Sequence, residues 1–172
     1  FPFKDHCIAL FEIFLSSFLC LALVVIGGYD ENQLSSSEMF SVSESKWIEL
    51  PDMTSERGNC PGAIVSECGG LPRIIVFGGW NNDKQTLDSC EYLDIGGDDK
   101  QKEWTLVEAK LKAARYHTAA ALLDVNTAVV CGGIGQNDKR LASCEAFDLA
   151  TLTFSDFPDL MEARSDHAIV HY

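Results

Sequence analysis

The sequence predicts an all-β chain built from repeated four-stranded antiparallel sheets, and two observations support this. Three apolar runs each end in a glycine pair, and the first glycines of these pairs, Gly27, Gly78 and Gly132, follow one another at intervals of about 50 residues. Elsewhere, short apolar stretches are separated by Gly, Asn, Asp and Ser, a pattern that favours strands over helices of about ten or more residues. At 172 residues and 47% hydrophobic content, the chain is large enough for a real core.

Each glycine pair begins a unit in which other residues recur in the same order. A polar loop comes first, then a glutamate on a short strand, an apolar residue two positions later, an aromatic residue and finally an arginine. The glutamates are Glu38, Glu91 and Glu145, the apolar residues Phe40, Leu93 and Phe147, the aromatics Trp47, Trp104 and Phe154, and the arginines Arg57, Arg115 and Arg164. A histidine follows two arginines, at His117 and His167, and we interpret these two as equivalent structural positions.

This order of residues resembles the kelch repeat. The resemblance rests on the glycine pair, Glu-x-aromatic-Asp at residues 145–148, the tryptophan, and Pro-x-Met with Arg between residues 51 and 57, and it extends over nearly the whole chain. It implies a β-propeller made of four-stranded blades. The repeat signature residues are Gly27, Gly28, Gly78, Gly79, Gly132, Gly133, Trp47, Trp104 and Phe154.

The repeats divide residues 1–172 into a partial kelch propeller of about three blades. We expect blade 1 at about 6–51, blade 2 at about 59–108, blade 3 at about 117–158, and the first strand of a fourth blade at 167–172. In blade 3 the strands are expected at about 117–123, 127–131 and 142–149 and around Phe154. Propellers close with typically 4–8 blades, so we expect a fragment of a longer chain whose exposed blade edges allow self-association.

Residues 7–26 form an apolar stretch with two interpretations. Its length suits a membrane span, and it resembles the apolar part of a signal segment. However, Asp5-His6-Cys7-Ile8 parallels Asp166-His167-Ala168-Ile169, which favours a strand hairpin that turns near Ser16 and Ser17. We favour the hairpin and expect no membrane contact, while the membrane alternative stays open.

Charge and cysteine usage restrict the partners and the compartment. The net charge of −13, without a cluster of Lys and Arg, argues against nucleic-acid binding. The seven cysteines include no CxxC pair, which favours buried free thiols in a reducing, cytoplasmic compartment. The histidines lie too far from paired cysteines to predict a zinc site, and we expect no metal and no cofactor.

The resemblance implies that one face of the disc, formed by the loops after each second strand and between blades, binds protein partners. Trp80 in its polar loop is the best anchor candidate, although it can equally pack onto its own blade. The arginines have a second interpretation, in which they bridge to the next blade through backbone carbonyls. The loops are 29–34, 80–87 and 134–140, and the candidate binding residues are Tyr29, Arg57, Asn59, Trp80, Asn81, Asn82, Arg115, Tyr116, Arg164 and Ser165.

The sequence therefore predicts a protein-interaction module without catalytic residues. The resemblance implies substrate recognition for a cullin-based ubiquitin ligase, or actin binding. The alternative is a fragment of a kelch-propeller enzyme similar to galactose oxidase or sialic-acid mutarotase, but no copper-ligand pattern of Tyr and His is recognisable. Ser165, Asp166 and His167 are consecutive, so as strand residues they point to alternate faces and form no catalytic relay.

Overall fold

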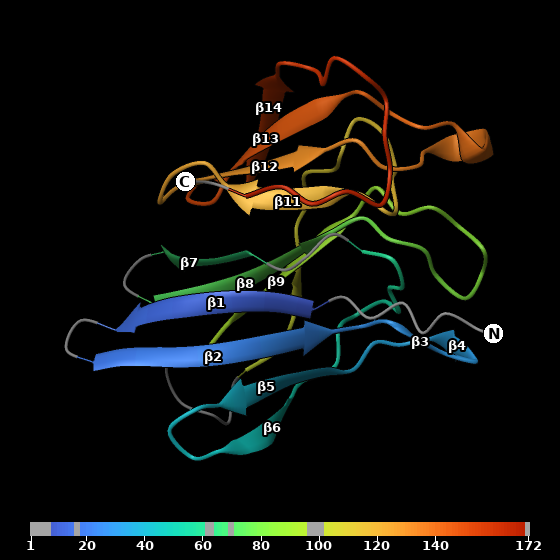
Figure 1. Cartoon of the computed structure of the whole chain (residues 1–172). Helices are drawn as coiled ribbons and strands as arrows, with labels where there is room; N and C mark the ends of the chain where they lie inside the picture. The colour runs from blue at the N-terminus through green and yellow to red at the C-terminus, as the bar shows by residue number, and fades with distance from the viewer. Residues whose placement is uncertain (1–7, 16–17, 61–63, 69–70, 96–101, 171–172) are drawn as a thin grey trace.

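The chain folds into three four-stranded antiparallel sheets, which we call blades 1, 2 and 3, and which lie one above the other (Figure 1). The computed structural model describes residues 8–15, 18–60, 64–68, 71–95 and 102–170. Blade 1 has the order β1 (Ile8–Leu15), β2 (Phe18–Ile26), β5 (Ser37–Ser41), β6 (Lys46–Leu50). Blade 2 consists of β7 (Ile64–Cys68), β8 (Leu71–Phe77), β9 (Cys90–Asp94) and β10 (Thr105–Leu106), and blade 3 of β11 (Ala119–Leu122), β12 (Thr127–Cys131), β13 (Cys144–Asp148) and β14 (Thr153–Phe157). The predicted all-β fold of repeated four-stranded antiparallel sheets is confirmed.

The three blades share one strand register. The repeated glutamate of the third strand lies opposite a valine of the second strand in each blade. These pairs are Val25 with Glu38, Val76 with Glu91, and Val130 with Glu145. Since a shift by one residue would turn every side chain to the other face, the common register places equivalent residues on equivalent faces.

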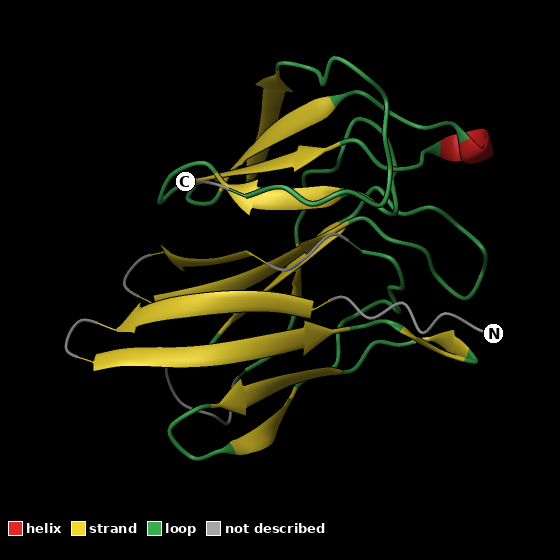
Figure 2. Cartoon of the chain, viewed as in Figure 1, coloured by secondary structure: helices red, strands yellow, loops and turns green. Residues whose placement is uncertain are grey.

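The loop after the second strand of each blade projects from the same side of the molecule, which we call the loop face (Figures 1 and 2). In blade 1 this loop forms the small hairpin β3 (Tyr29–Asp30) and β4 (Asn32–Gln33). In blade 2 Trp80 bridges to Thr86, and in blade 3 Ile134 bridges to Arg140 around the short 3-10 turn η2 (Gln136–Asp138). The loops thus start from equivalent positions but have different tips.

The apolar N-terminal stretch is a β-hairpin. β1 and β2 pair antiparallel from Ile8 opposite Val25 to Leu15 opposite Phe18. The predicted turn at Ser16 and Ser17 lies outside the described residues. In the described part of the chain, no helix has the length and apolar character needed to cross a membrane.

The hydrophobic core lies between neighbouring blades. Trp104, only 4% exposed, packs against blade 1 and donates its Nε1 proton to the carbonyl oxygen of Pro51 at 2.9 Å. Phe154 reaches Phe77 of blade 2 with ring centroids 6.1 Å apart. Trp47, which recurs at the position of Trp104, is 49% exposed, because no sheet among the described residues covers that side of blade 1.

The first strand of a fourth blade, predicted at 167–172, is not seen in the described residues. Residues 167–170 belong to no strand, and residues 171–172 lie outside the described part. A β-strand needs a hydrogen-bonded neighbour, and the described residues provide no further second strand with which this segment could pair. The segment nevertheless lies against blade 3, where Ile169 packs on the cluster of Val129, Cys131 and Cys144.

The predicted equivalence of His117 and His167 is also wrong. The residue two positions after each arginine adopts a left-handed backbone, with φ of 50° at Asn59, 50° at His117 and 55° at Asp166. These residues are linked in a chain, since the His117 N–H bonds to the Asn59 carbonyl at 2.8 Å and the Asp166 N–H to the His117 carbonyl at 3.1 Å. His167 comes one position later, and the left-handed turn also delays the start of β11 to Ala119.

Candidate functional site

The glycine pair allows the arginine loop to close against its own blade. Gly78 has φ of 56°, and a Cβ atom there would collide with the carbonyl oxygen of Arg115. The next residue, Gly79, donates its N–H to that same carbonyl oxygen at 2.9 Å. The same bond joins Gly28 to Arg57 and Gly133 to Arg164. The arginine backbone therefore belongs to the blade that it follows.

The arginine side chain, by contrast, enters the next blade. Arg57 is fully buried, and its Nη1 donates to the carbonyl oxygens of Gly78 at 2.8 Å and Ser89 at 3.0 Å. Its Nη2 and Nε donate to Oε1 of the buried Glu91 at 2.7 and 3.0 Å. The other carboxylate oxygen of Glu91 accepts the N–H of Thr54 at 2.7 Å. Both charges are thus paired and hydrogen-bonded, which a buried ion pair requires.

Arg115 repeats this arrangement between blades 2 and 3. Its side chain is 1% exposed and donates to the Gly132 carbonyl at 3.1 Å, the Ser143 carbonyl at 2.7 Å and Oε1 of Glu145 at 2.8 Å. Oε2 of Glu145 accepts the N–H of Lys112 at 2.9 Å. Burial lowers the pKa of the Arg115 guanidinium, and the charge of Glu145 opposes that shift.

The predicted role of Arg57 and Arg115 as partner-binding residues is therefore wrong. Their guanidinium groups are inside the protein, where no partner can reach them. Their alternative interpretation, a bridge to the next blade through carbonyls, describes them correctly, and the repeated glutamate is the additional acceptor. Arg164 differs from both, since half of its side chain surface is exposed.

Three aromatic rings form a cluster beside the loop of blade 2. The rings of Trp80 and Tyr116 lie 5.1 Å apart, and those of Tyr116 and His117 5.2 Å apart. Two backbone hydrogen bonds of 2.9 Å tie Trp80 to Gly58, and the Tyr116 hydroxyl donates to Asp138 at 3.1 Å. All three rings are half-buried. The cluster is thus held in place while part of its surface stays accessible.

A groove lies between the loops of blades 2 and 3, beside this cluster. Its volume is about 550 Å³. The residues that line it are Trp80, Lys84, Gln85 and Thr86 from blade 2, and Gly135, Gln136, Asn137 and Asp138 from blade 3. The groove thus has one aromatic wall, many polar groups, one positively charged side chain and one negatively charged side chain. Such a lining fits a polypeptide better than an apolar small molecule.

The other predicted binding residues are spread over the loop face. Asn82 joins two loops, because its side chain accepts the Gln33 N–H at 2.6 Å and donates to the Gln33 carbonyl at 3.1 Å. Asn81 accepts the Gln85 N–H at 2.9 Å and shapes its own loop. Tyr29, Asn59 and Ser165 are half-buried outside the groove.

The sequence singles out Trp80 and Tyr116 but not Lys84 and Asp138 of the groove. Asp138 and Lys84 lie inside the loop ranges that the repeat marks out, 134–140 and 80–87. The sequence, however, does not show that these two loop tips face each other. The Ser165 hydroxyl donates to Asp166 at 2.8 Å, and Asp166 contacts His117 at 2.6 Å. The carboxylate therefore lies between the hydroxyl and the imidazole, whereas in a catalytic triad the imidazole lies between the hydroxyl and the carboxylate.

Two buried thiols give a first testable prediction. Burial raises the pKa of Cys90 to about 12 and that of Cys131 to about 12, and both side chains are almost inaccessible. Because the thiolate is the reactive form, we expect iodoacetamide to leave both residues unmodified at about pH 8 and to modify both in urea. Peptide mass spectrometry measures this, and rapid modification of either thiol in the folded chain would contradict the buried setting.

Comparison with known proteins gives two matches. Residues 18–54 match the family model of the kelch motif, which covers β2 to the segment after β6. An F-box/kelch-repeat protein of Arabidopsis thaliana is 35% identical over 65 residues. That match covers 37% of this chain and 17% of the plant protein, so the chain corresponds to a small part of its relative's length.

Proposed function

We propose that this chain, a kelch-repeat protein, is a protein-binding module that holds its partner in the groove between the loops of blades 2 and 3. Kelch repeats generally mediate protein–protein interaction. The observation that carries the proposal is the ordered pair of Trp80 and Tyr116 beside a groove with polar walls. Half-buried aromatic residues in such settings are typical anchors of protein interfaces.

The geometry favours a partner segment that passes between the two loop tips. Trp80 is fixed by its backbone bonds to Gly58 and by its ring contact with Tyr116, so little side-chain freedom is lost on binding. Lys84 and Asp138 lie at the groove with opposite charges. A segment with an apolar side chain against Trp80 and polar groups along the loops fits these walls.

The finer proposal is that the module recognises substrates for a cullin-based ubiquitin ligase in the cytoplasm. The support is the similarity to an F-box/kelch-repeat protein, whose name pairs the repeat with an F-box. The buried free thiols of Cys90, Cys131 and Cys144 suit a reducing compartment. The proposed role is binding and not catalysis.

Trp80→Ala tests the binding proposal. We expect this variant to weaken binding of a partner isolated with the wild-type chain by roughly 30-fold, the equivalent of about 2 kcal/mol for an anchor residue. Isothermal titration calorimetry with the purified partner measures the affinity. Circular dichroism of the variant checks that its sheets are intact.

The matched control is Val125→Ala. Val125 is 73% exposed and lies in the turn between β11 and β12, at the opposite end of the strands from the loop face. Its replacement should leave the affinity unchanged. Equal binding by wild type and Trp80→Ala, or equal losses in both variants, would overturn the proposal.

A further inference from the structure

The loops of blades 2 and 3 have the same length and the same backbone bonds at their bases. They occupy residues 80–86 and 134–140, between the second glycine of the pair and a leucine. In both loops the N–H of that leucine bonds to the carbonyl of that glycine at 2.9 Å. A bond from the N–H of the second loop residue to the carbonyl of the sixth also recurs, at 3.1 and 2.8 Å. Asn82 therefore corresponds to Gln136, and both side chains end in a carboxamide.

At the joint between blades 1 and 2, Asn82 binds the main chain of the preceding loop. Its side-chain oxygen accepts the Gln33 N–H at 2.6 Å, and its side-chain nitrogen donates to the Gln33 carbonyl at 3.1 Å. Gln33 lies opposite Tyr29 in a hairpin that the bond from the Leu34 N–H to the Gly28 carbonyl closes. Because this bond flanks the pair, both main-chain groups of Gln33 point away from Tyr29 and toward Asn82.

Thr86 has the position of Gln33 in the loop of blade 2, but its main-chain groups are unpaired. It precedes the leucine of its loop by one residue, as Gln33 does, and it lies opposite Trp80. The same flanking bond, from the Leu87 N–H, directs the Thr86 N–H and carbonyl away from Trp80. Neither group has a hydrogen-bond partner among the described residues. Since Thr86 lines the groove, a bound segment can reach both groups.

One repeat position explains why the first joint is closed on the loop face and the second is open. Gly58 and Tyr116 each follow a buried arginine and exchange two backbone bonds of 2.7 to 3.0 Å with the first residue of the next loop. At Gly58 the Gln33 side chain occupies the space, since a Cβ atom there would collide with its carbonyl oxygen. At the second joint this position carries the Tyr116 ring, which contacts Trp80 and donates to Asp138. The loops of blades 2 and 3 are therefore held apart, and the groove of about 550 Å³ lies between them.

We propose that the groove binds an extended polypeptide segment by its main chain, between Thr86 on one wall and Gln136 on the other. This inference rests on the proposed function and specifies how the partner is recognised. The Gln136 carboxamide holds one residue of the segment as Asn82 holds Gln33. The neighbouring residue pairs with the N–H and carbonyl of Thr86, because successive residues of an extended strand direct their main-chain groups to opposite sides. Addition of an extended segment to unpaired main-chain groups is a common mode of peptide recognition.

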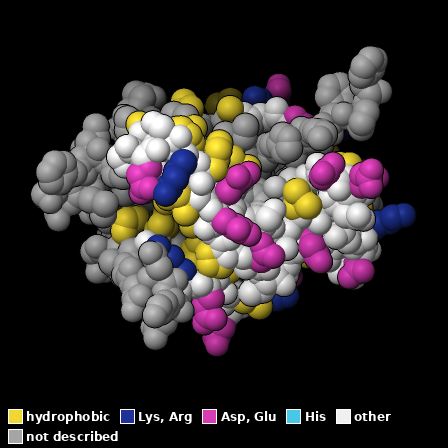
Figure 3. Space-filling view, turned by 90° about the horizontal axis from the view of Figure 1, so that it is seen from below, with side chains coloured by type: hydrophobic (Ala, Val, Ile, Leu, Met, Phe, Trp, Pro, Cys, Tyr) yellow, Lys and Arg dark blue, Asp and Glu magenta, His cyan; other side chains and the backbone are white. Residues whose placement is uncertain are grey.

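Recognition by the main chain leaves the sequence preference of the groove to a few side chains. Trp80 provides the aromatic wall, so we expect an apolar residue of the segment beside it. Proline is excluded at the two bonded positions, because it has no N–H to donate. Negative charge does not single out the groove, since Asp and Glu side chains are also spread over the side of blade 1 (Figure 3). Short segments of varied sequence therefore fit.

Backbone methylation of a peptide probe tests the proposal. The probe is a peptide of about ten residues, selected on the wild-type chain from a random-sequence display library. Isothermal titration calorimetry compares it with a series in which one amide nitrogen at a time carries a methyl group, which removes the N–H donor and keeps the side chain. We expect roughly 10-fold weaker binding at two positions, whose N–H groups bond to the Thr86 carbonyl and to the side-chain oxygen of Gln136.

A double-mutant cycle assigns one of these positions to Gln136. Gln136→Ala should weaken binding of the unmethylated peptide by roughly 10-fold. Methylation of the N–H that Gln136 accepts should then cost no more than about twofold, because the bond is already absent. Circular dichroism checks that the sheets of the variant are intact.

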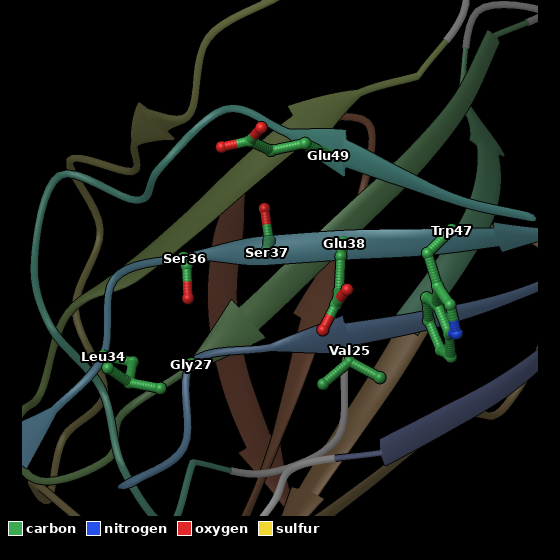
Figure 4. A pocket seen from close by; sticks show the side chains of 8 residues that line it. All are labelled: Val25, Gly27, Leu34, Ser36, Ser37, Glu38, Trp47 and Glu49. Carbon is green, nitrogen blue, oxygen red and sulfur yellow. The ribbon is translucent and has the colours of Figure 1, made fainter. Parts of the chain in front are cut away.

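The control Glu49→Gln replaces a carboxylate by a carboxamide away from the groove. Glu49 is exposed and lines a pocket of about 470 Å³ on blade 1, together with Glu38 and Trp47 (Figure 4). This variant should bind the peptide as the wild type does.

The outcomes distinguish this inference from the proposed function. If no methylated position weakens binding, or if the cost of methylation is the same in the wild type and in Gln136→Ala, recognition by the main chain is overturned. The proposed groove still stands in that case when Trp80→Ala weakens binding of the peptide. Selected peptides that bind Trp80→Ala as tightly as the wild type, or a library that yields no binder, overturn both. A loss of affinity in Glu49→Gln also overturns both, because the peptide then lies on blade 1.

Discussion

Glu91→Gln is expected to lower the free energy of unfolding by roughly 3–5 kcal/mol, because the substitution leaves the fully buried guanidinium of Arg57 without its counter-charge. The amide can still accept one hydrogen bond, but it cannot neutralise the charge. Since a domain is stable by only about 5–15 kcal/mol, a loss of this size shifts the unfolding transition strongly. Urea unfolding followed by circular dichroism measures the change.

Glu38→Gln is the matched control for this experiment. Glu38 stands at the same repeat position, in the same strand register, but is exposed. In dilute solution, where association does not contribute, its replacement should change stability by no more than about 0.5 kcal/mol. Equal losses at both positions would show that the glutamate acts through its own strand and not through the joint between blades.

Trp104→Ala is the second substitution with a large expected effect, a loss of roughly 3–5 kcal/mol. The indole is 4% exposed, and it packs in the cluster between blades 1 and 2. Its removal leaves a cavity there and takes away the hydrogen bond to the Pro51 carbonyl. The change in the midpoint of urea unfolding, with an unchanged slope, reports this loss.

The repeat again offers a matched control, Trp47→Ala. Trp47 contacts Phe40 at a ring distance of 5.3 Å but is 49% exposed. Its replacement should cost about 1 kcal/mol in dilute solution, the usual worth of one aromatic pair. If Trp47→Ala proved as destabilising as Trp104→Ala, burial between blades would not explain the repeated aromatic residue.

The sequence predicts most of the fold because the residues that recur in each repeat have narrow structural roles. A glycine pair at a left-handed turn, as at Gly132 and Gly133, cannot be replaced without collision, so it marks the end of each second strand. The parallel between residues 5–8 and 166–169 identified the N-terminal hairpin although its composition suits a membrane segment. The second strand of blade 3 was predicted at its observed bounds.

The candidate site was harder to predict, because its residues act across blades. Arg57 and Arg164 are equivalent in sequence, yet Arg57 is buried against blade 2 whereas Arg164 is exposed, because the described residues include no sheet beyond blade 3. The strand expected at 167–172 is not formed by residues 167–170, because the described residues offer this segment no neighbouring strand. The spacing of His117 and His167 from their arginines differs by one residue, and only the left-handed backbone at His117 and Asp166 reveals the true register.

The most direct test of the joint between blades is a double-mutant cycle on Arg115 and Glu145, with Arg115→Met, Glu145→Gln and the combined variant measured by urea unfolding. Because the two side chains meet at 2.8 Å in a buried setting, we predict that the combined loss is smaller than the sum of the single losses by roughly 2 kcal/mol. Single losses that add within about 0.5 kcal/mol would contradict the claim that this ion pair joins one blade to the next.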